Sequence, residues 1–518
     1  MRNYKKAVSF ILVLTMLAAA SVFSLQAFAA DTENLLASGI ETNEKDFIIA
    51  EKLAALGIVD VVSEDELANY MTRADIIGIL IKYLNLSGVT VDADTTPFLD
   101  VSVYEPQISA YRALHQAGYI SGDENKMYRP NDLLTYNEAV TLIVNAMGYK
   151  FFAVRNGGYP EGYLYTANKH GLLKGLRGNG NNPIPYCDLY RIIEASLDAD
   201  AVVGHAYNAD GVGEFVLQKG VTVLEETYKI KLIKGIVTGT EDTRLMSSGS
   251  ELIAMDQIEI NNVIYDAPGK IYAEYLGRNV LAYAKKNEQS EYEIIYIELA
   301  DNQNNETQLD ADVILPKSEQ VSQDKLYYEG EGGKRKYLNL NSVATSVIYN
   351  GKYTGNALRN VLPESGYVVA LDNNGDEVID VLFIYEYKNI VVGAMDKQNY
   401  TIYDKNSEEC FVFDPENDDV RIHAAGRYGS FDDIEMGSLL SVTETDNTTG
   451  YKLVNIYINS RRITGKVQEI LNDKYYIGDA YYKLAPNVKK YVEDGDLLEL
   501  KLGMNVIALL DKDCKIGH

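Results

Sequence analysis

The sequence predicts an α+β multidomain protein, with an N-terminal all-α unit of helical repeats and a C-terminal series of small all-β modules. Up to about residue 200, apolar residues recur with the 3.6-residue period of helices; beyond it they recur with the two-residue period of strands. Both parts also repeat internally. Because repeats of tens of residues are built as copies of one structural unit, these observations together determine the fold class.

Each N-terminal repeat has the pattern of a helix, a loop and a second helix. The first helix of each repeat ends at a glycine, the usual left-handed helix stop. These glycines are Gly57, Gly118 and Gly171. Thr72 and Thr135 are the predicted N-caps of the second helices, and Asp75 and Glu138 complete capping boxes three positions later. Since two short helices cannot bury their apolar faces alone, we expect the three repeats to pack as one pseudo-threefold unit.

Short motifs recur in the same order along these repeats. The motifs are M-T-R-A-D at 71–75 in the first repeat; F-L-D-V at 98–101, G-Y-I-S-G at 118–122 and Y-R-P-N at 128–131 in the second; and G-G-Y-P-E-G-Y at 157–163, G-L-L at 171–173 and the segment near Asp188 in the third. The region from about 45 to 200 therefore resembles three tandem S-layer homology repeats. The pattern of that family is F-x-D-V, G-I-x-x-G, F-x-P and I/V-T-R-A-E.

The resemblance implies non-covalent attachment to the cell wall, through pyruvylated secondary cell-wall polysaccharide held in grooves between repeats. Arg73 matches the T-R-A-E arginine that lines such a groove, and a planar guanidinium can bind a ketal carboxylate in a bidentate geometry. Tyr136 and Tyr186 occupy the corresponding positions of the other repeats, which predicts at most one family-like groove, with sugar stacking on the tyrosines. Asp75 and Asp100 complete the predicted binding residues. The alternative is a surface Arg73 paired with Asp75 or with a neighbouring helix.

The N-terminus predicts export. Basic residues at 2, 5 and 6, an apolar stretch at 7–25 and an A-x-A site ending at Ala29 form a secretory signal peptide over 1–29. No later apolar run approaches the roughly 20 residues that span a bilayer, so we expect no membrane contact after signal removal. The formal charge of −27 argues against nucleic acid as a partner. Cys187, Cys410 and Cys514 are too far apart for a disulfide framework, and Cys187 is predicted to be a core thiol.

The C-terminal part repeats a glycine-led strand. L-G-R-N-V-L-A at 276–282 returns as L-G-M-N-V-I-A at 502–508, with looser copies at 365–370 and 436–442. A second strand follows the first three copies, at 294–297, 381–384 and 453–458, whereas only 516–518 follow the fourth. This predicts four barrel-like β modules with the last incomplete, in a fragment of a longer surface protein or a natural truncation.

The predicted organisation resembles long exported clostridial-type proteins of Gram-positive bacteria, which carry S-layer homology repeats followed by β modules. We expect the signal peptide at 1–29, helical repeats at 45–90, 95–152 and 153–205, and β modules at 206–305, 306–388, 389–460 and 461–518.

One turn in the second β module has the spacing of a calcium loop. Asp372, Asn374, Asp376 and Asp380 fall at positions 1, 3, 5 and 9, but Glu377 replaces the glycine of position 6 and no bidentate glutamate closes the loop. The pattern predicts weak Ca²⁺ binding at most, and no other cofactor. The favoured alternative is a polar hairpin turn, because the sister turns at 285–293 and 445–451 connect strands without these carboxylates.

The sequence contains no recognisable catalytic motif. The five histidines are isolated, no G-x-S-x-G elbow is present, and the glycine-rich stretch at 175–180 lacks a following G-K-S/T. We therefore predict a structural cell-surface protein rather than an enzyme, with wall polysaccharide, peptidoglycan and S-layer lattice proteins as partners. Two alternatives remain: an anchored glycosidase or peptidase whose catalytic site is unrecognised or lost, and an exported binding protein whose repeats have drifted and no longer anchor.

Overall fold

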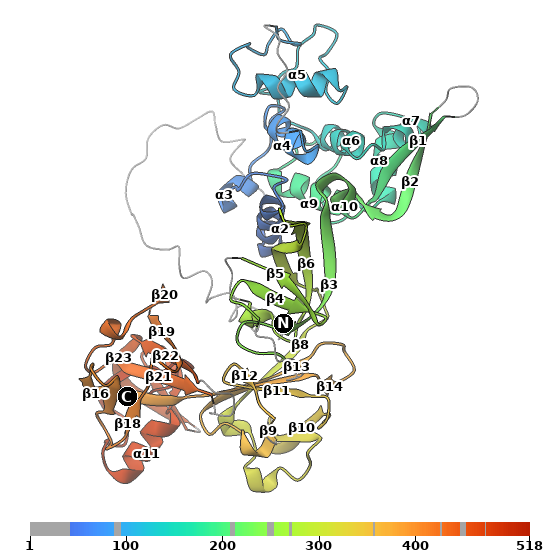
Figure 1. Cartoon of the computed structure of the whole chain (residues 1–518). Coiled ribbons are helices and arrows are strands. Elements are labelled where there is room, and N and C mark those ends of the chain that lie inside the picture. The colour runs from blue at the N-terminus through green and yellow to red at the C-terminus, as the bar shows by residue number, and fades with distance from the viewer. Residues whose placement is uncertain are drawn as a thin grey trace, which may run out of the picture. The chain divides into compact units, whose positions relative to one another are not determined.

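The computed structural model describes residues 42–86, 95–207, 213–245, 253–268, 272–355, 358–424, 427–445, 452–471 and 473–518 (Figure 1). The predicted signal peptide and its cleavage site at Ala29 lie outside these residues. The chain divides into two compact units, which are described separately. Among the described residues, the helical unit comprises those up to Lys234 and Leu281–Glu298, and the β unit comprises Gly235–Val280 and Leu299–His518. No helix within the described residues is long and apolar enough to cross a membrane.

The N-terminal repeats are helical, and with the strands beyond them they confirm the α+β multidomain class. The helices are α2 (Glu44–Ala55), α3 (Glu64–Leu67), α4 (Asp75–Tyr83), α5 (Ile108–Gln116), α6 (Tyr136–Ala146), α7 (Lys150–Arg155), α8 (Glu161–Lys169), α9 (Tyr186–Leu197) and α10 (Val223–Tyr228). An antiparallel hairpin that the sequence did not predict, β1 (Asp200–Tyr207) and β2 (Gly213–Thr222), lies between α9 and α10.

The predicted helix signals are largely confirmed. Gly57, Gly118 and Gly171 all have positive φ angles, of 74°, 76° and 78°. Thr135 caps α6 in a complete capping box with Glu138. Thr72 differs, because α4 begins at Asp75 with Ala74 as its N-cap. The Asp75 carboxylate nevertheless accepts hydrogen bonds from the Thr72 amide and hydroxyl, at 2.7 and 2.8 Å, so the capping contacts form one turn ahead of the helix.

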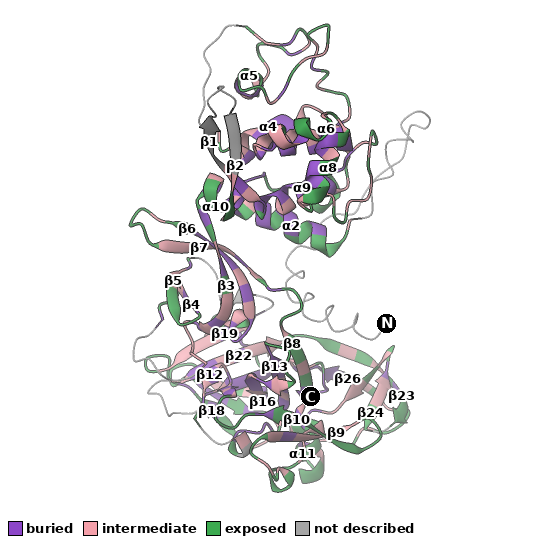
Figure 2. Ribbon diagram, turned by 90° about the vertical axis from the view of Figure 1, so that its right-hand side faces the viewer, coloured by how far each residue is buried: buried purple, intermediate pink, exposed green. Residues whose placement is uncertain are grey.

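The loops before the second helices meet in a closed ring of main-chain hydrogen bonds. The amide of Met71 donates to the carbonyl of Ile184 at 2.9 Å, Ile184 donates to Leu134 at 2.9 Å, and Leu134 donates to Met71 at 2.8 Å. Each repeat thus donates to one neighbour and accepts from the other. One apolar cluster runs through all three repeats and includes Leu53, Ile143 and Ile193, and Figure 2 shows buried residues concentrated in α4, α6, α8 and α9.

The remaining strands form a barrel and several open sheets. Strands β3 (Ile230–Gly239), β4 (Gln257–Ile260), β5 (Val263–Asp266), β6 (Asn279–Lys286) and β7 (Tyr292–Leu299) form a closed barrel in the order β3-β4-β5-β7-β6. The next sheets are β12-β11-β15-β13-β8 and β14-β10-β9. Their strands are β8 (Asn305–Asp310), β9 (Lys325–Gly330), β10 (Lys334–Leu340), β11 (Ser346–Tyr349), β12 (Lys352–Tyr353), β13 (Gly366–Asp372), β14 (Val378–Ile379) and β15 (Val381–Glu386).

A seven-stranded sheet, β18-β17-β16-β21-β22-β19-β20, and a four-stranded sheet, β25-β24-β23-β26, complete the β unit. Their strands are β16 (Lys388–Asp396), β17 (Thr401–Asp404), β18 (Cys410–Val412), β19 (Asp419–Ala424), β20 (Arg427–Tyr428), β21 (Leu439–Glu444), β22 (Leu453–Asn459), β23 (Arg462–Leu471), β24 (Lys474–Ile477), β25 (Ala480–Lys483) and β26 (Asn505–Leu509). Helix α11 (Pro486–Asp494) was not predicted. The predicted second strands are confirmed, because 294–297, 381–384 and 453–458 lie in β7, β15 and β22.

Candidate functional site

The three residues at the T-R-A-E arginine position all face an acidic residue of another repeat. Arg73 of the first repeat forms an ion pair with Glu138 of the second. The hydroxyl of Tyr136 in the second repeat donates to Asp188 of the third. In the third repeat, burial raises the pKa of Tyr186, and the charge of Asp75 in the first repeat, together with a hydrogen bond to it, raises the pKa further. The contacts therefore run from repeat to repeat in one direction, around the ring of main-chain hydrogen bonds.

Arg73 is held by the loop of the second repeat as well as by Glu138. Its Nε donates to the carbonyl of Tyr128 at 2.8 Å, and the Tyr128 hydroxyl donates back to the Arg73 carbonyl at 2.8 Å. The guanidinium carbon lies 4.8 Å from the centre of the Tyr128 ring. The side chains of Arg73 and Glu138 remain 22% and 29% exposed. The sequence left open that Arg73 pairs with a neighbouring helix, and it does so through Glu138. This ion pair is still accessible to solvent.

Two polar features of this pair are open to a ligand. The second terminal nitrogen of Arg73, Nη2, makes no hydrogen bond to any described residue, because the side-chain hydrogen bonds of Arg73 are donated by Nε and Nη1. Tyr159 is 57% exposed. Burial raises the pKa of Tyr159, the charge of Glu138 raises it further and the charge of Arg73 lowers it, so the phenol lies within electrostatic range of both partners of the ion pair. Sequence reasoning missed Tyr159, although it lies in the G-G-Y-P-E-G-Y motif of the third repeat.

Asp75 and Asp100 hold the loops around this site. The carboxylate of Asp75 accepts from Thr72, as described above. Asp100 accepts hydrogen bonds from the amides of Tyr128 and Arg129, at 2.8 and 2.7 Å. Both aspartates therefore fix the main chain that presents Arg73 and Tyr128, and these internal donors occupy both oxygens of Asp100 and Oδ2 of Asp75.

Tyr136 lies in the core and not in a groove. It is only 2% exposed, and a Cβ atom on Gly178 would lie 2.5 Å from its ring. Sugar stacking requires an open ring face, which Tyr136 does not offer in this structure. Tyr186 is half-buried. The structure therefore brings Arg73, Tyr128 and Glu138 together, and it leaves Tyr136 outside that group.

A buried charged cluster joins the first and third repeats. Asp46 and Asp188, which are 1% and 0% exposed, both form ion pairs with Arg177, and Arg191 Nε donates to Asp46 at 2.8 Å. Burial alone would raise the pKa of Asp46, but hydrogen bonds from Asn43 and Arg177 and the charges of both arginines hold it below its usual value. Cys187 is buried beside this cluster, as predicted for a core thiol, and burial raises its pKa to about 11.

The predicted calcium loop forms the turn between β13 and β14. Asp372 accepts hydrogen bonds from the amides of Asn374, Gly375 and Glu377, at 3.2, 2.6 and 3.1 Å. Gly375 and Glu377 both have positive φ angles, of 81° and 66°. The Asp372 carboxylate is therefore used to accept hydrogen bonds from the main-chain amides of its own tight turn.

The other predicted ligands also contact the turn itself. Asp380 accepts from the amide of Asn373 at 2.8 Å, and Asp376 accepts from Val378 at 2.9 Å. In the part of the chain that the structure describes, no group of three or more His, Cys, Asp or Glu side chains is placed to hold a metal ion. Calcium binding by this loop remains a prediction.

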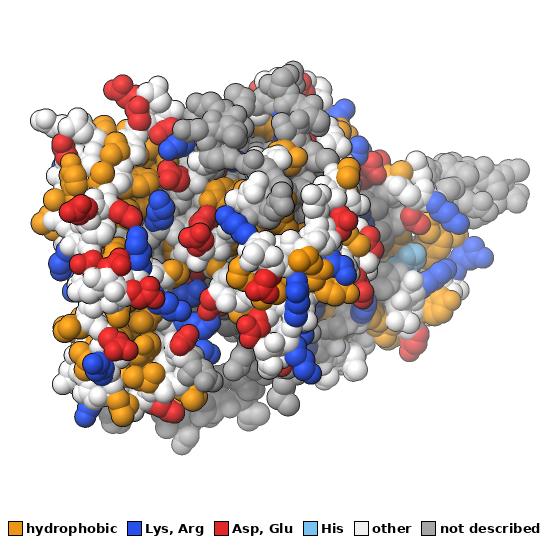
Figure 3. Space-filling model, turned by 90° about the horizontal axis from the view of Figure 1, so that it is seen from below, with side chains coloured by type: hydrophobic (Ala, Val, Ile, Leu, Met, Phe, Trp, Pro, Cys, Tyr) orange, Lys and Arg blue, Asp and Glu red, His pale blue; other side chains and the backbone are white. Residues whose placement is uncertain are grey.

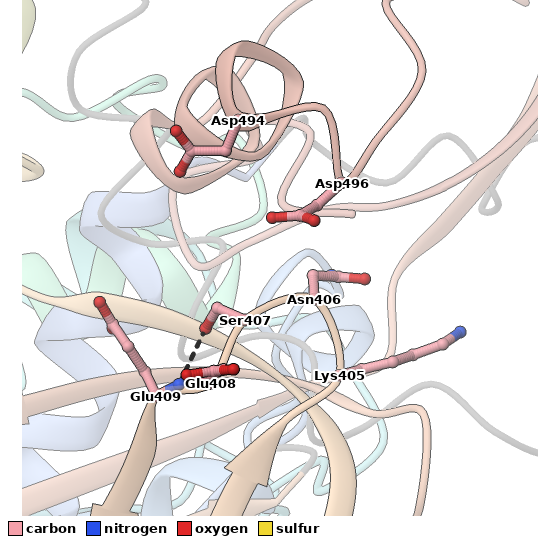
Figure 4. A pocket seen from close by; sticks show the side chains of 7 residues that line it. All are labelled: Lys405, Asn406, Ser407, Glu408, Glu409, Asp494 and Asp496. Atoms are coloured by element: carbon pink, nitrogen blue, oxygen red, sulfur yellow. Dashed lines mark hydrogen bonds between the residues drawn. The ribbon is translucent and has the colours of Figure 1, made fainter.

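One open hollow lies in the β unit, with a volume of about 680 Å³. Figure 4 shows Asp494 and Asp496, at the end of α11, across from the turn after β17. The lining residues are Lys405, Asn406, Ser407, Glu408, Glu409, Asp494 and Asp496. The hollow is therefore acidic, and it contains none of the residues that the sequence singled out.

Comparison with known proteins identifies one segment of the second helical repeat. Residues 109–140 match the S-layer homology domain. The chain is 23% identical to a cell surface protein of Thermoanaerobacter kivui over 99% of its own length and 61% of that protein. It is 21% identical to the middle cell wall protein of Brevibacillus brevis, covering 93% of this chain and 49% of the relative. A surface layer protein of Brevibacillus choshinensis is also 21% identical, with 90% and 47% covered.

The chain thus spans about half to three-fifths of the length of these relatives. A multidomain protein with nucleic acid binding domains from Streptococcus pneumoniae TIGR4 aligns with 51% of this chain and 80% of its own, at 12% identity; its TM-score of 0.10 is too low to support any argument. The domain match and the surface proteins aligned along nearly the whole chain agree with each other. The chain is therefore a cell-surface protein of the cell wall or S-layer that carries an S-layer homology domain.

Proposed function

We propose that the three helical repeats act as one pseudo-threefold unit that holds the protein on the cell wall by binding secondary cell-wall polysaccharide. The observation that carries this proposal is the Arg73–Glu138 pair, with an unused Nη2 and with the exposed Tyr159 within electrostatic range of both partners. A sugar carboxylate has a guanidinium to bind there, and a pyranose ring has an exposed aromatic side chain to pack against.

Glu138 sets a condition on this binding. A ligand carboxylate near Arg73 meets the charge of Glu138, so Arg73 must serve two carboxylates at once or exchange one for the other. Arginine can do the former, because its five N–H donors point in two directions. The Nε and Nη1 donors are already used by the protein, so the ligand is expected to bind through Nη2.

The β unit is proposed to be the structural or S-layer-associated part of the protein, and S-layer lattice proteins are its proposed partners. Support comes from the curated relatives, which are named as cell surface, middle cell wall and surface layer proteins. We further propose that the protein is not an enzyme.

Sedimentation with purified wall sacculi tests the anchoring role. The chain without its predicted signal peptide should sediment with sacculi, and this should be lost after the pyruvylated polymer is removed. Arg73→Ala should weaken binding by about tenfold or more, because a charge-assisted contact contributes about 1.5–3 kcal/mol. Tyr159→Ala should weaken it less, and Tyr136→Ala should act only through stability.

Arg129→Ala is the matched control. Its side chain is 58% exposed, pairs with Asp123 and lies in the same repeat region, so the variant removes one positive charge without touching the Arg73 pair. Equal binding by Arg73→Ala and the parent would refute the groove. Sedimentation that does not depend on the polymer would leave the repeats as a drifted module that does not anchor through it.

A further inference from the structure

The four-stranded sheet of the fourth β module repeats the strand order of the third module. The third module's sheet runs β18-β17-β16-β21-β22-β19-β20, and the fourth module's sheet runs β25-β24-β23-β26. Both sheets contain the same antiparallel pair, β16 with β21 in the third module and β23 with β26 in the fourth. The glycines before β21 and β26 also bond alike, because Gly437 donates to Val392 and Gly503 donates to Val467, both at 2.8 Å. Strand β26 therefore corresponds to β21, and the next place in its sheet is that of β22.

Only a short segment lies at the place of β22. In the third module, β22 pairs with the whole of β21, and at the start of this pairing the amide of Thr445 donates to Leu453 at 3.1 Å. The fourth module begins the pairing in the same way, because the amide of Asp511 donates to Lys515 at 2.8 Å. Residues 516–518 follow, and within the part of the chain that the structure describes no further strand lies beside β26 on this side.

The free edge of β26 presents unpaired main-chain groups. Successive residues of an antiparallel strand bond alternately to the neighbours on its two sides. The amide of Leu509 donates to His518 at 2.8 Å, whereas the amide of Leu510 donates to the residue that precedes β23, at 2.9 Å. The amides and carbonyls of Asn505 and Ile507 therefore point to the same side as those of Leu509, where no described strand accompanies them.

The core of the fourth module is less covered on the same side. In β21, Leu440 is fully buried, and Ile458 of β22 lies directly opposite it. The corresponding residue of β26 is Val506, which packs against the core of its module but is only partly buried. An apolar side chain on a strand beside β26 would cover Val506 as Ile458 covers Leu440.

Exposure alone does not distinguish this edge. Ile507 is 72% exposed, but hydrophobic side chains lie among charged ones over the face drawn in Figure 3, and scattered exposed apolar residues need no partner. Strands β18 and β20 also lie at sheet edges. The edge of β26 differs from these because its counterparts are paired, β21 with β22 in the third module and β13 with β15 in the second.

We propose that the free edge of β26 binds an extended segment of another surface polypeptide, which adds to the sheet as an antiparallel strand. The main chain of that segment would bond to Asn505 and Ile507, and an aliphatic side chain would cover Val506. Such a strand needs branched aliphatic residues at alternate positions, as in β22, where Val454 and Ile456 are buried. Strand addition of this kind takes its affinity from main-chain hydrogen bonds and its specificity from the alternate side chains.

The added strand is assigned to a different chain because all strands of the β unit within the described residues already belong to a sheet. Unpaired edges are the usual places where sheets acquire strands from other chains. The proposal names a site for the partnership with S-layer lattice proteins, so it rests on that part of the proposed function and not on the helical groove.

The test is fluorescence anisotropy of a labelled peptide with the sequence of β22, residues 453–459, added to the chain without its predicted signal peptide. The peptide should bind saturably. Ile507→Pro should weaken binding by about tenfold, because proline removes the amide that would bond to the added strand. Since that amide donates to no strand among the described residues, the variant should keep the melting temperature of the parent.

Ile507→Ala is the matched control. It removes the exposed side chain and keeps the amide, so the affinity should change by less than about threefold. A peptide with Ile456→Asp and Ile458→Asp should bind at least about tenfold more weakly, because both charges would face the core. A chain that carries residues 457–459 of β22 after His518 should fill the edge with its own strand and should no longer bind the peptide.

No binding by the parent, equal binding by Ile507→Pro, or equal binding of the two peptides would overturn the proposal. Self-association of the parent in sedimentation velocity, lost in Ile507→Pro, would identify the β26 edges of two copies as the partners and would also overturn it. Sacculus sedimentation of Ile507→Pro should equal that of the parent, because the helical groove is unchanged. Binding of lattice proteins by a chain that binds no peptide would refute the strand site and leave the proposed role of the β unit in place.

Discussion

The helical unit and the β unit are held together in different ways. In the helical unit, one apolar cluster takes residues from all three repeats, and each repeat contacts the other two through main-chain hydrogen bonds. In the β unit, the apolar residues fall into separate clusters: one within 309–384, one within 390–458 and one within 463–516. The helical repeats therefore depend on one another. In the β unit the two sheets within 309–384 share one core, the other two sheets have separate cores, and only small clusters, such as that of Val391, Leu439 and Leu509, join neighbouring regions.

This difference predicts different unfolding behaviour. A unit that shares one core and a closed ring of contacts should unfold in a single transition, while sheets with separate cores can open one after another. The following changes test that contrast, from the largest expected effect to the smallest.

Asp46→Ala should destabilise the helical unit by about 3–5 kcal/mol, because it removes the buried partner of Arg191 and one of the two buried partners of Arg177. The loss should lower the melting temperature of the whole helical transition, followed by circular dichroism at 222 nm. Asp60→Ala is the control, since that carboxylate is 79% exposed and its pair with Lys82 should contribute less than about 1 kcal/mol. A melt in which only part of the helical signal moves would contradict the shared-core description.

Ile456→Ala should remove about 2–5 kcal/mol from the stability of the seven-stranded sheet, because Ile456 is fully buried in β22. We expect differential scanning calorimetry to show one β transition moving while the helical transition stays in place. Ile507→Ala, at a position that is 72% exposed in β26, should leave both transitions nearly unchanged. A shift of the helical transition with Ile456→Ala would mean that the two units are energetically coupled.

Much of the helical unit could be predicted from the sequence because its signals are local. The capping box at Thr135 and the glycine stops at Gly57, Gly118 and Gly171 involve residues within one turn of each other. Helix α11 was missed although Pro486 at its first turn and Gly495 at its end, with φ of 87°, are local signals of the same kind.

The site could be predicted only in part, because its contacts depend on how the repeats pack. Arg73 was found by its motif, but its partner Glu138 is 65 residues away and was read only as a capping residue. The burial of Tyr136 also depends on how the repeats pack. Tyr136 occupies the same position in its repeat as Arg73, but the glycine-rich loop at 175–180 of the next repeat covers its ring. The position of a residue within its repeat thus predicts which neighbouring repeat its side chain contacts, but it does not predict how exposed that side chain is.

Acid should act in opposite directions on the contributions of two buried carboxylates, Asp46 of the helical unit and Asp513 of the β unit. The pKa of Asp46 is lowered in the folded state, so its stabilisation is present above its unfolded pKa near 3.8 and is lost as the pH falls through the folded value. Burial raises the pKa of Asp513, despite the hydrogen bond from Tyr387, so its contribution is present below pH 3.8 and is lost as the pH rises through the folded value.

Asp513→Asn should therefore stabilise the β unit at pH 7 and should have little effect at pH 3. Asp46→Asn should destabilise the helical unit at pH 7 and should lose that effect as the pH approaches 3. Urea unfolding of both variants and the parent, followed across pH 3–7, checks both signs. The same pH dependence in both variants would show that neither carboxylate controls the acid response of its unit.

Calcium should have the smallest effect. The oxygens of Asp372 and Asp380 accept amide hydrogen bonds from the turn, so a cation would have to share or replace them. At a calcium concentration equal to a millimolar Kd, binding would add about 0.4 kcal/mol to the free energy of unfolding, and at tenfold excess about 1.4 kcal/mol. Calorimetry of the full chain with ten millimolar calcium and with chelator should therefore shift one β transition by a few degrees at most. Asp376→Asn, which keeps the amide contact and removes one charge, should reduce any shift. A larger shift, or one in the helical transition, would place the calcium site elsewhere in the chain.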